Sequence, residues 1–356
     1  MRYVFGPVPS RRLGRSLGID PVPLKTCNWN CVYCQLGRTS PLIHARREWH
    51  PREEILAEVE AALAAHPSDE IDWVTFVASG ETTLHRGLGR MIERVKRLTE
   101  HPVAVITNGS LLYLSRVREE LAPSDAVLPS LDAGGATLYR KINRPHPRST
   151  YQRLVQGLID FRGAYTGKLW VEVMLVQGLN DDEPNLRAIA AVLESVRPDE
   201  VHINSPIRPP AEAWVRPPDP EGLMRAGSIL GQSARVIQPT EGAFELGEND
   251  DIIEAVLAII TRHPMRQAEL EDSLGARICG HDRGAGYIEI QPALSKLEAS
   301  GRARRVVRHG TLFWVAAESR FAEAEPGAAR RADGGQGLQL QTRLETSSKF
   351  NRFGVR

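Results

Sequence analysis

Three of the four cysteines of this chain lie in one short segment, KTCNWNCVYCQLGR (residues 25–38). Cys27, Cys31 and Cys34 have the spacing C-x3-C-x2-C. Cysteine thiolates are the ligands of iron–sulfur clusters, and a closed cubane needs four of them. A set of three leaves one iron with an open coordination position, where a substrate or a cofactor can bind. The spacing therefore predicts a 4Fe–4S cluster with a reactive vacancy.

A structural zinc site is the alternative interpretation of the same segment. His44 follows the three cysteines and would complete a tetrahedral set of ligands. Zinc knuckles usually come as two paired sets, and the sequence holds no second C-x2-C pair. The fourth cysteine, Cys279, is remote from the segment, and we expect it to be structural or incidental. The cluster is the favoured hypothesis.

The composition is that of a soluble protein with reduced thiols. The chain has 356 residues, a net charge of +1 and 42% hydrophobic residues, which suits one large and one small domain. Three neighbouring cysteines do not make a secreted disulfide framework, and the N-terminus shows no apolar signal segment. The longest apolar stretch, 252–260, is too short to span a bilayer. We therefore expect a cytoplasmic protein without membrane contact.

Short β-branched runs alternate with helical patterns between Ser16 and about Pro239. This alternation predicts the strands and helices that must position the cysteines. Apolar stripes with three-to-four spacing, such as Leu186, Ile189 and Leu193, mark the helices. Repeated strand–helix units predict parallel strands with right-handed crossovers, in a doubly wound sheet or in a full or incomplete barrel. The expected strands are 16–20, 71–79, 103–108, 126–131, 169–175 and 200–204.

Polar side chains follow every expected strand. In (β/α) barrels the chemistry takes place at the carboxyl ends of the strands. Any one of these residues is a common turn former or helix cap, but the whole set is harder to explain by capping. The set comprises the cysteine segment, Ser79-Gly80-Glu81-Thr82, Thr107-Asn108-Gly109, Ser130 with Asp132, Asn180, and Asn204.

The composition changes beyond residue 205, where a proline-rich segment begins. Helical patterns near 252–262, 265–274 and 287–300 precede two apolar runs around a His309-Gly310 turn. Three helices and a hairpin in this order are typical of a winged helix-turn-helix module. The expected division of the chain is a barrel domain (1–239), a linker (240–250), a winged-helix-like domain (251–317) and a disordered tail (318–356).

Basic residues of the expected winged helix leave its partner open. A basic wing suits the phosphate backbone of a nucleic acid, but acidic residues lie on the preceding helix, and winged helices also bind proteins. An iron–sulfur redox sensor that binds DNA through this module is therefore the alternative to an enzyme. The basic residues are Lys296, Arg302, Arg304, Arg305 and Arg308.

The cysteine segment resembles the radical S-adenosylmethionine (SAM) superfamily, whose hallmark is C-x3-C-x2-C with an aromatic residue, here Tyr33, before the last cysteine. The segment ASGETTL (78–84) is similar to the Gly-Gly-Glu segment of that family, with Ser79 in place of the first glycine. The resemblance covers about residues 6–239. It implies the cluster ligands Cys27, Cys31 and Cys34, and the SAM-contacting residues Tyr33, Gly80, Glu81, Asn108, Ser130, Asp132 and Asn180.

The resemblance also implies a fold and a reaction. The fold would be α/β, a partial (β/α)6 TIM-like barrel with the small winged-helix domain after it. SAM would chelate the fourth iron through its amino and carboxylate groups, and Glu81 would bind the methionyl ammonium. Reductive cleavage of the C5′–S bond would give a 5′-deoxyadenosyl radical, which abstracts a hydrogen atom from the substrate.

Four further segments, within 6–20, 107–112, 130–145 and 202–212, are similar to iron–sulfur oxidoreductases related to the tRNA wyosine-forming enzymes. This similarity implies an RNA nucleoside as substrate without establishing it, and a peptide stays open. Those enzymes carry a second cluster, which Cys279 alone cannot hold. The chain shows no flavodoxin-like segment, so we expect a separate flavodoxin- or ferredoxin-type reductant.

Basic residues near the barrel mouth are candidates for substrate contact. Arg11, Arg12 and Arg15 precede the cysteine segment, and Arg144 and His146 follow the fourth expected strand. Guanidinium groups bind phosphate and carboxylate, so these residues could clamp an anionic substrate. Surface salt bridges or helix caps explain them equally well. The residues that act in catalysis itself are not identified by the sequence.

Overall fold

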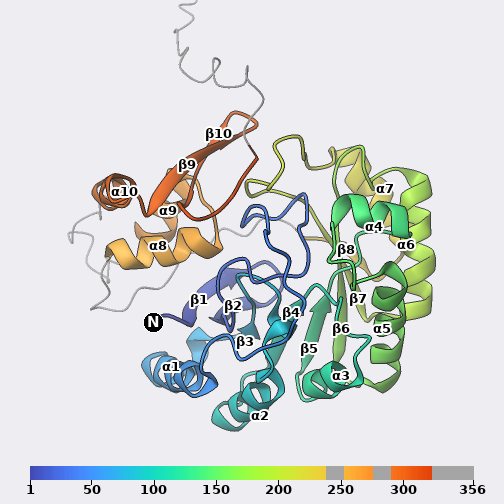
Figure 1. Ribbon diagram of the computed structural model, residues 1–356, viewed down its shortest axis with the longest axis horizontal. Helices are drawn as coiled ribbons and strands as arrows, with labels where there is room; N and C mark the ends of the chain where they lie inside the picture. The colour runs from blue at the N-terminus through green and yellow to red at the C-terminus, as the bar shows by residue number, and fades with distance from the viewer. Residues whose placement is uncertain (238–251, 276–289, 323–356) are drawn as a thin grey trace, which may run out of the picture.

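The computed structural model describes residues 1–237, 252–275 and 290–322 of the chain. In this part, strands alternate with helices around a curved sheet, and a smaller C-terminal module lies beside it (Figure 1). The linker expected over 240–250, Cys279 and the tail from residue 323 lie outside the described residues. No described helix is long and apolar enough to cross a membrane.

One sheet of eight strands forms the barrel wall in the order β1 to β8. β1 and β2 form an antiparallel hairpin, and every later pair is parallel. β1 and β8 are the two edges, so the α/β partial barrel that the sequence predicts is confirmed. The strands are β1 (Val4–Ser10), β2 (Gly14–Ile19), β3 (Trp73–Phe76), β4 (Val103–Thr107), β5 (Ala126–Pro129), β6 (Lys168–Met174), β7 (Glu200–Asn204) and β8 (Ala234–Val236).

Helices cover the outside of the sheet (Figure 1). At the start of α6 (Glu183–Val196), the Asp182 side chain accepts a hydrogen bond from Asn185 N, and Leu186 and Ile189 are buried on the inner face. A capping residue and an apolar stripe thus set both the start and the orientation of this helix. The other barrel helices are α1 (Arg52–Ala65), α2 (Leu88–Leu98), α3 (Ser115–Leu121), α4 (Ala136–Ile142), α5 (Tyr151–Ala164) and α7 (Pro220–Leu230).

Two apolar layers stabilise the barrel. The larger lies between the sheet and the helices and includes Val74, Val105 and Ile189. The smaller includes Ala104 and Trp170, which lie near the amino ends of their strands, inside the barrel. This inner layer fills the amino-terminal end, so the remaining space opens toward the loops that follow the strands.

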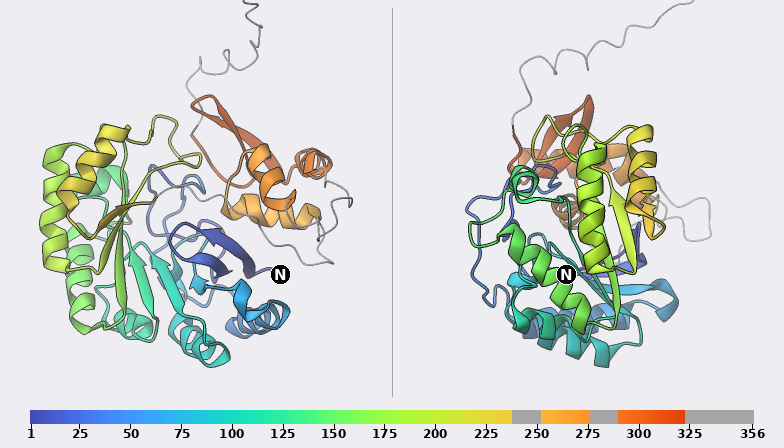
Figure 2. Two further views of the ribbon diagram at one scale, coloured as in Figure 1. Left: turned by 180° about the vertical axis from the view of Figure 1, so that it is seen from behind. Right: turned by 90° about the vertical axis from the view of Figure 1, so that its right-hand side faces the viewer.

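The C-terminal module has an apolar core of its own, which includes Val256, Leu294 and Trp314. It lies beside the β1–β2 hairpin in Figure 1 and in the left view of Figure 2. The predicted hairpin around His309-Gly310 is present, and its assignment to the winged helix-turn-helix class stays a prediction. Its elements are α8 (Ile252–Arg262), α9 (Gln267–Gly275), α10 (Ile290–Ala299), β9 (Ala303–Arg308) and β10 (Thr311–Ala316).

Two strands of the sheet, β1 and β8, are absent from the sequence prediction. β1 contains Gly6, Pro7 and Pro9, which interrupt the alternation that marks a strand, and β8 has only three residues. Proline is tolerated at a sheet edge because an edge strand leaves half of its N–H groups unpaired. β3 and β5 end earlier than predicted, so the polar residues after them belong to loops.

Candidate functional site

The cysteine loop leaves β2 at the carboxyl end of the sheet and packs against the loop that follows β3. Lys25 N donates a hydrogen bond to Ser79 O at 2.6 Å, and Glu81 N donates to Thr26 O at 2.8 Å. A Cβ atom on Gly80 would clash with the Thr26 carbonyl. Glycine at this position therefore permits the close approach of the two loops.

Each cysteine sulfur accepts a hydrogen bond from a different N–H group. Such donors favour the thiolate, which is the form of cysteine that binds iron. The three bonds run from Lys25 Nζ to Cys34 Sγ (3.2 Å), from Trp29 N to Cys27 Sγ (3.4 Å) and from Asn143 Nδ2 to Cys31 Sγ (3.6 Å).

The three cysteines form no disulfide and are partly exposed. Burial is the main cause that raises the pKa of Cys27 to about 12, so a bound metal has to displace the thiol proton. A cubane binds each cysteine through a different iron, so the three sulfurs need not converge on one point. Within the described ranges, no three His, Cys, Asp or Glu side chains are grouped as a site for a single metal ion.

Glu81 is buried, and hydrogen-bond donors surround its carboxylate. Oε1 accepts from Thr83 N at 2.9 Å and from the hydroxyls of Thr83 and Thr107 at 2.5 Å each. Oε2 accepts from Asn108 N at 2.7 Å, and therefore keeps acceptor capacity for one more donor. A buried carboxylate with a free acceptor position is suited to an external ammonium group, such as that of SAM.

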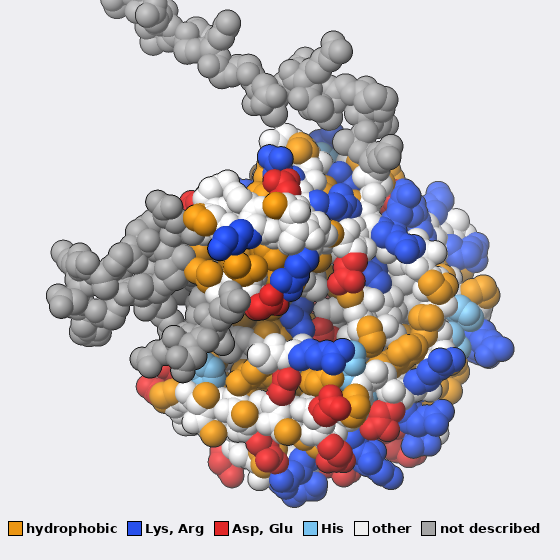
Figure 3. Space-filling model, turned by 60° about the vertical axis from the view of Figure 1, so that its left-hand side comes forward, with side chains coloured by type: hydrophobic (Ala, Val, Ile, Leu, Met, Phe, Trp, Pro, Cys, Tyr) orange, Lys and Arg blue, Asp and Glu red, His pale blue; other side chains and the backbone are white. Residues whose placement is uncertain are grey.

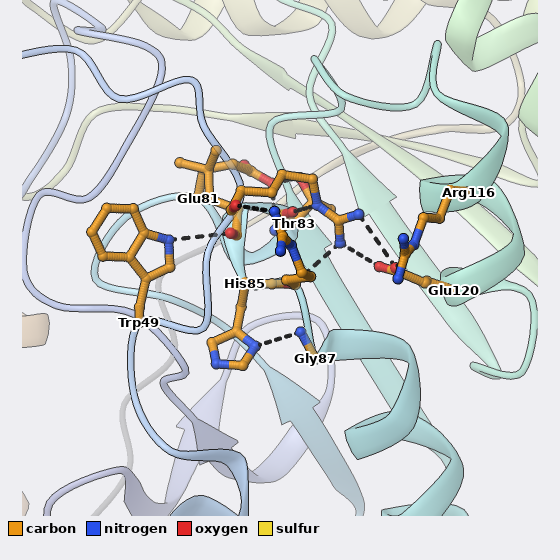
Figure 4. A network of polar contacts seen from close by, with 10 residues as sticks. Trp49, Glu81, Thr83, His85, Gly87, Arg116 and Glu120 are labelled. Atoms are coloured by element: carbon orange, nitrogen blue, oxygen red, sulfur yellow. Dashed lines mark hydrogen bonds and ion pairs between the residues drawn. The ribbon is translucent and has the colours of Figure 1, made fainter.

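The loop that carries Glu81 is also fixed from outside the site (Figure 4). Arg46 Nε donates to Thr83 O at 2.7 Å, and the same guanidinium forms an ion pair with Glu120 of α3. The indole N–H of Trp49 donates a hydrogen bond to the backbone carbonyl of Leu84. These bonds hold the backbone around Glu81 without using its carboxylate.

Asp132 connects the cysteine loop with β6 and the end of α4. Its Oδ2 accepts from Tyr33 Oη at 2.5 Å and from Asn143 Nδ2 at 2.6 Å, and its Oδ1 accepts from Met174 N at 2.8 Å. Burial raises the pKa of Asp132, and the three hydrogen bonds act in the opposite direction. Asp132 therefore positions Tyr33, and with it the segment that carries Cys34.

The structure brings Asn108 to the cysteines, where its Nδ2 lies 3.9 Å from Cys27 Sγ and 2.8 Å from Asn28 Oδ1. Asn180 is fully buried, and its amide bonds at 2.9 Å to the carbonyls of Asp132 and Met174. Asn180 therefore lies behind Asp132 rather than beside the cysteines. Ser130, also expected to contact SAM, forms a backbone bridge to β6. The roles expected for these residues stay predictions.

Three residues that contact this site are absent from the sequence prediction: Lys25, Asn28 and Asn143. Lys25 and Asn28 lie within the cysteine segment, where their polarity was the available signal. Asn143 is 112 residues away from Cys31 in the sequence, and only the fold brings the two together.

The candidates for substrate contact occupy different places. Arg11 and Arg12 line a cavity inside the barrel, where Arg12 also pairs with Glu172 of β6. The other candidates contact partners elsewhere: Arg15 pairs with Asp72, Arg144 pairs with Glu212, and His146 stacks on His44. The structure thus brings together Arg11 and Arg12 but not the whole set.

The basic residues of the hairpin have partners within the chain. A nucleic acid would have to compete with these contacts, and binding of a nucleic acid by the module stays a prediction. Arg302 pairs with Glu254, Arg305 pairs with Glu298, Arg304 bonds to Ser319 O, and Arg308 bonds to Pro210 O.

The chain is similar to several known proteins. Residues 22–187 match the model of the radical SAM superfamily. A UPF0026 protein of Methanocaldococcus jannaschii is 36% identical over 322 residues, which cover 88% of this chain and 96% of that protein. A UPF0026 protein of Synechocystis is 39% identical over 207 residues, or 58% of this chain and 76% of that protein. The solved structure of TYW1 with a lysine-pyruvate adduct bound is 20% identical, has a TM-score of 0.47, and covers 61% of this chain and 72% of that chain.

Proposed function

The chain belongs to the UPF0026 proteins and to the radical SAM superfamily of iron–sulfur enzymes, and from this premise we propose that Cys27, Cys31 and Cys34 hold its 4Fe–4S cluster. The family uses this cluster together with SAM. The observation that carries the proposal is the set of N–H donors on the three sulfurs, beside a buried carboxylate that has an acceptor position to spare.

Held by Cys27, Cys31 and Cys34, the cluster would supply together with SAM the one-electron chemistry that yields a 5′-deoxyadenosyl radical for hydrogen abstraction from the substrate. Glu81 would accept a hydrogen bond from the methionyl ammonium through Oε2, the oxygen that already accepts a hydrogen bond from the backbone N–H of Asn108. The ion pair of Arg46 with Glu120 keeps the same loop fixed while the ligand exchanges.

The substrate and the reductant belong to the same proposal. Radical SAM enzymes generally take their electron from an external donor, and we assign this role to a flavodoxin or ferredoxin. An RNA nucleoside or a peptide is the substrate that the sequence favours. Tyr33 and Asp132 order the cysteine loop next to the open end of the barrel, where a substrate can enter.

The test is anaerobic turnover of the reconstituted protein with dithionite, with and without candidate RNAs and peptides. We expect about four irons per chain, the visible absorption of a 4Fe–4S cluster, and formation of 5′-deoxyadenosine. Cys31→Ala should abolish all three signals, whereas Cys279→Ala, outside the cysteine segment, should keep them. Deuterium transfer from substrate to 5′-deoxyadenosine would locate the abstracted hydrogen.

Three results would contradict this proposal. Zinc without iron after anaerobic purification would favour a structural zinc site. Cluster-dependent DNA binding without cleavage of SAM would favour the redox sensor. Unchanged cleavage in Cys31→Ala would show that the three-cysteine cluster is not the reactive centre.

A further inference from the structure

A cavity of about 1240 Å³ lies between the barrel interior and the C-terminal module. Ser16, Thr75 and Ile106, on three neighbouring strands, line its inner part, and Met265 and Phe313 of the module line its outer part. Gln35, the residue after Cys34, also lines it. The cavity therefore extends from the barrel strands to the edge of the cysteine loop, and the module forms one of its walls.

The charged lining of this cavity is almost entirely positive. Glu269 is the single acid among the described lining residues, and it already pairs with Arg208 at 3.0 Å and with Arg266 at 2.7 Å. Figure 3 shows Lys and Arg side chains along the boundary between module and barrel. The arginines that line the cavity are Arg11, Arg12, Arg208, Arg216, Arg266 and Arg308.

Arg308 as a whole and the Nη1 atom of Arg11 are withdrawn from solvent, without a hydrogen bond to a carboxylate among the described residues. Arg11 Nη1 is buried and has no hydrogen-bond partner among the described residues. Arg308 is buried, and its hydrogen bonds go to the carbonyls of Pro210, Val307 and Ala322. A buried cation without an anionic partner is costly unless a ligand supplies the charge.

Arg208 lies near enough to Arg11 for its positive charge to act on that side chain. Burial, and secondly the neighbouring Arg208, lower the pKa of Arg11. His263 lines the same part of the cavity, and burial together with Arg208, Arg262 and Arg11 lowers its pKa to about 3. This histidine therefore stays neutral at physiological pH and leaves the arginines as the charged groups there.

We propose that this cavity is the substrate site and that the substrate carries an oxyanion, bound by Arg11, next to an apolar body. This step rests on the proposed function, because it names the substrate class of the same reaction. Guanidinium groups bind phosphate and carboxylate with paired hydrogen bonds. Phe5, Ile207 and Phe313, which line the same cavity, provide contacts for the apolar body.

The test is calorimetric titration of the full-length reconstituted protein with phenyl phosphate, phenylacetate and, as a neutral control, benzyl alcohol. Binding of either anion but not of the alcohol supports the proposal. The anion with the higher affinity shows whether the oxyanion of the substrate is a phosphate or a carboxylate. Arg11→Met should weaken the binding of that anion about tenfold, whereas Arg90→Met, an exposed change on α2, should leave it unchanged.

Stability provides a second readout for the same variant. Removal of a guanidinium whose Nη1 is buried without a partner should leave the unfolding midpoint of Arg11→Met unchanged or raise it in the absence of anion. If that variant does not fold, Arg216→Met, at an exposed position of the lining, tests the same charge cluster and should also weaken anion binding.

Equal affinity for the anions and the alcohol, or unchanged anion affinity in both arginine variants, would overturn the inference. Its failure is distinguishable from failure of the proposed function, because 5′-deoxyadenosine forms from SAM and dithionite without an added oxyanion. Cleavage of SAM without anion binding overturns only this inference. Anion binding without cleavage of SAM overturns the proposed function.

Discussion

Glu81 shows how a single side chain can be prepared for a ligand. Three hydrogen bonds to Oε1 fix the orientation of the carboxylate, and a single bond leaves Oε2 able to accept another. The carboxylate is almost completely buried, so a cation that reaches it interacts in a medium of low dielectric constant. We therefore expect the negative charge of the Glu81 carboxylate, and not the shape of the side chain alone, to matter for SAM binding.

Glu81→Gln should weaken SAM binding while leaving the cluster in place. The amide keeps the size of the side chain but removes the negative charge that faces the ammonium. Loss of a charge-assisted hydrogen bond of this kind costs about 1.5–3 kcal/mol, or roughly a 10- to 150-fold increase in the dissociation constant. Titration of the reconstituted variant with SAM measures the constant, and the visible absorption reports the cluster.

Glu119→Gln is the matched control, because Glu119 is exposed on α3 and lies next to Glu120 in the same helix. Its affinity for SAM should equal that of the unchanged protein. An unaltered dissociation constant in Glu81→Gln would show that the ammonium is bound elsewhere.

At the scale of elements, Glu212 joins segments that are far apart in the sequence. Arg38, after the cysteine loop, donates two hydrogen bonds to it at 2.9 and 2.6 Å, and Arg144, after α4, donates one at 2.5 Å. The Glu212 backbone N–H bonds to Val32 O at 3.0 Å. Glu212 therefore fixes the segment after β7 against the cysteine loop.

Glu212→Gln should destabilise the fold at neutral pH, by an amount that disappears in acid. Burial alone would raise the pKa of Glu212, but the hydrogen bonds from Arg38 and Arg144 outweigh it and hold the pKa below its usual value of 4.5. The ionised group thus adds stability above pH 4.5, and this contribution is lost as the pH falls through the lower pKa of the folded state.

Urea unfolding at pH 7 and at stepwise lower pH measures this effect. We expect a loss of about 1–3 kcal/mol at pH 7, because both arginines are partly exposed. The difference between variant and parent should shrink as the pH falls below 4.5. Glu221→Gln, exposed on α7, is the control and should show no difference. A loss that is independent of pH would indicate a packing defect instead of a lost ion pair.

The sequence predicts the elements better than the contacts between them. The parallel strands β3 to β7 are readable from short, mostly apolar runs, whereas the three-residue strand β8 is not, and the cysteines are readable from their spacing. The hairpin strand β1 is not, because Pro7 and Pro9 break its pattern. The position of Asn143 beside Cys31 could not be predicted, since tertiary packing alone creates it.

At the scale of the whole molecule, the C-terminal module docks on the barrel through polar contacts distributed over several segments. Arg208, after β7, pairs with Glu269 of α9, and His309 of the hairpin turn bonds to Val215 O at 2.7 Å. The segment after β10 continues this contact. Arg320 forms a backbone bridge with Gly37, and its carbonyl accepts a hydrogen bond from Arg38 N. The module thus contacts the barrel through α9, through its hairpin turn and through the segment that follows β10.

Arg262 is the contact whose removal should loosen this docking most directly. Its Nε donates to Asp20 Oδ2 at 3.2 Å, its guanidinium lies over the ring of Phe5 at 4.9 Å, and its carbonyl accepts from Gln35 Nε2 at 2.9 Å. Asp20 also accepts two hydrogen bonds from Ser79, so this one arginine connects α8 with the loop that carries Glu81.

Arg262→Met should therefore increase local opening between module and barrel without unfolding either. Loss of a largely buried ion pair should speed amide hydrogen exchange in α8 and in residues 35–38 by about tenfold. The barrel helices α2 and α5 should exchange as before. Arg305→Met, which removes an exposed pair inside the module, should leave all of these rates unchanged. Equal exchange in both variants would mean that the pairs formed by Arg208 and His309 hold the module without Arg262.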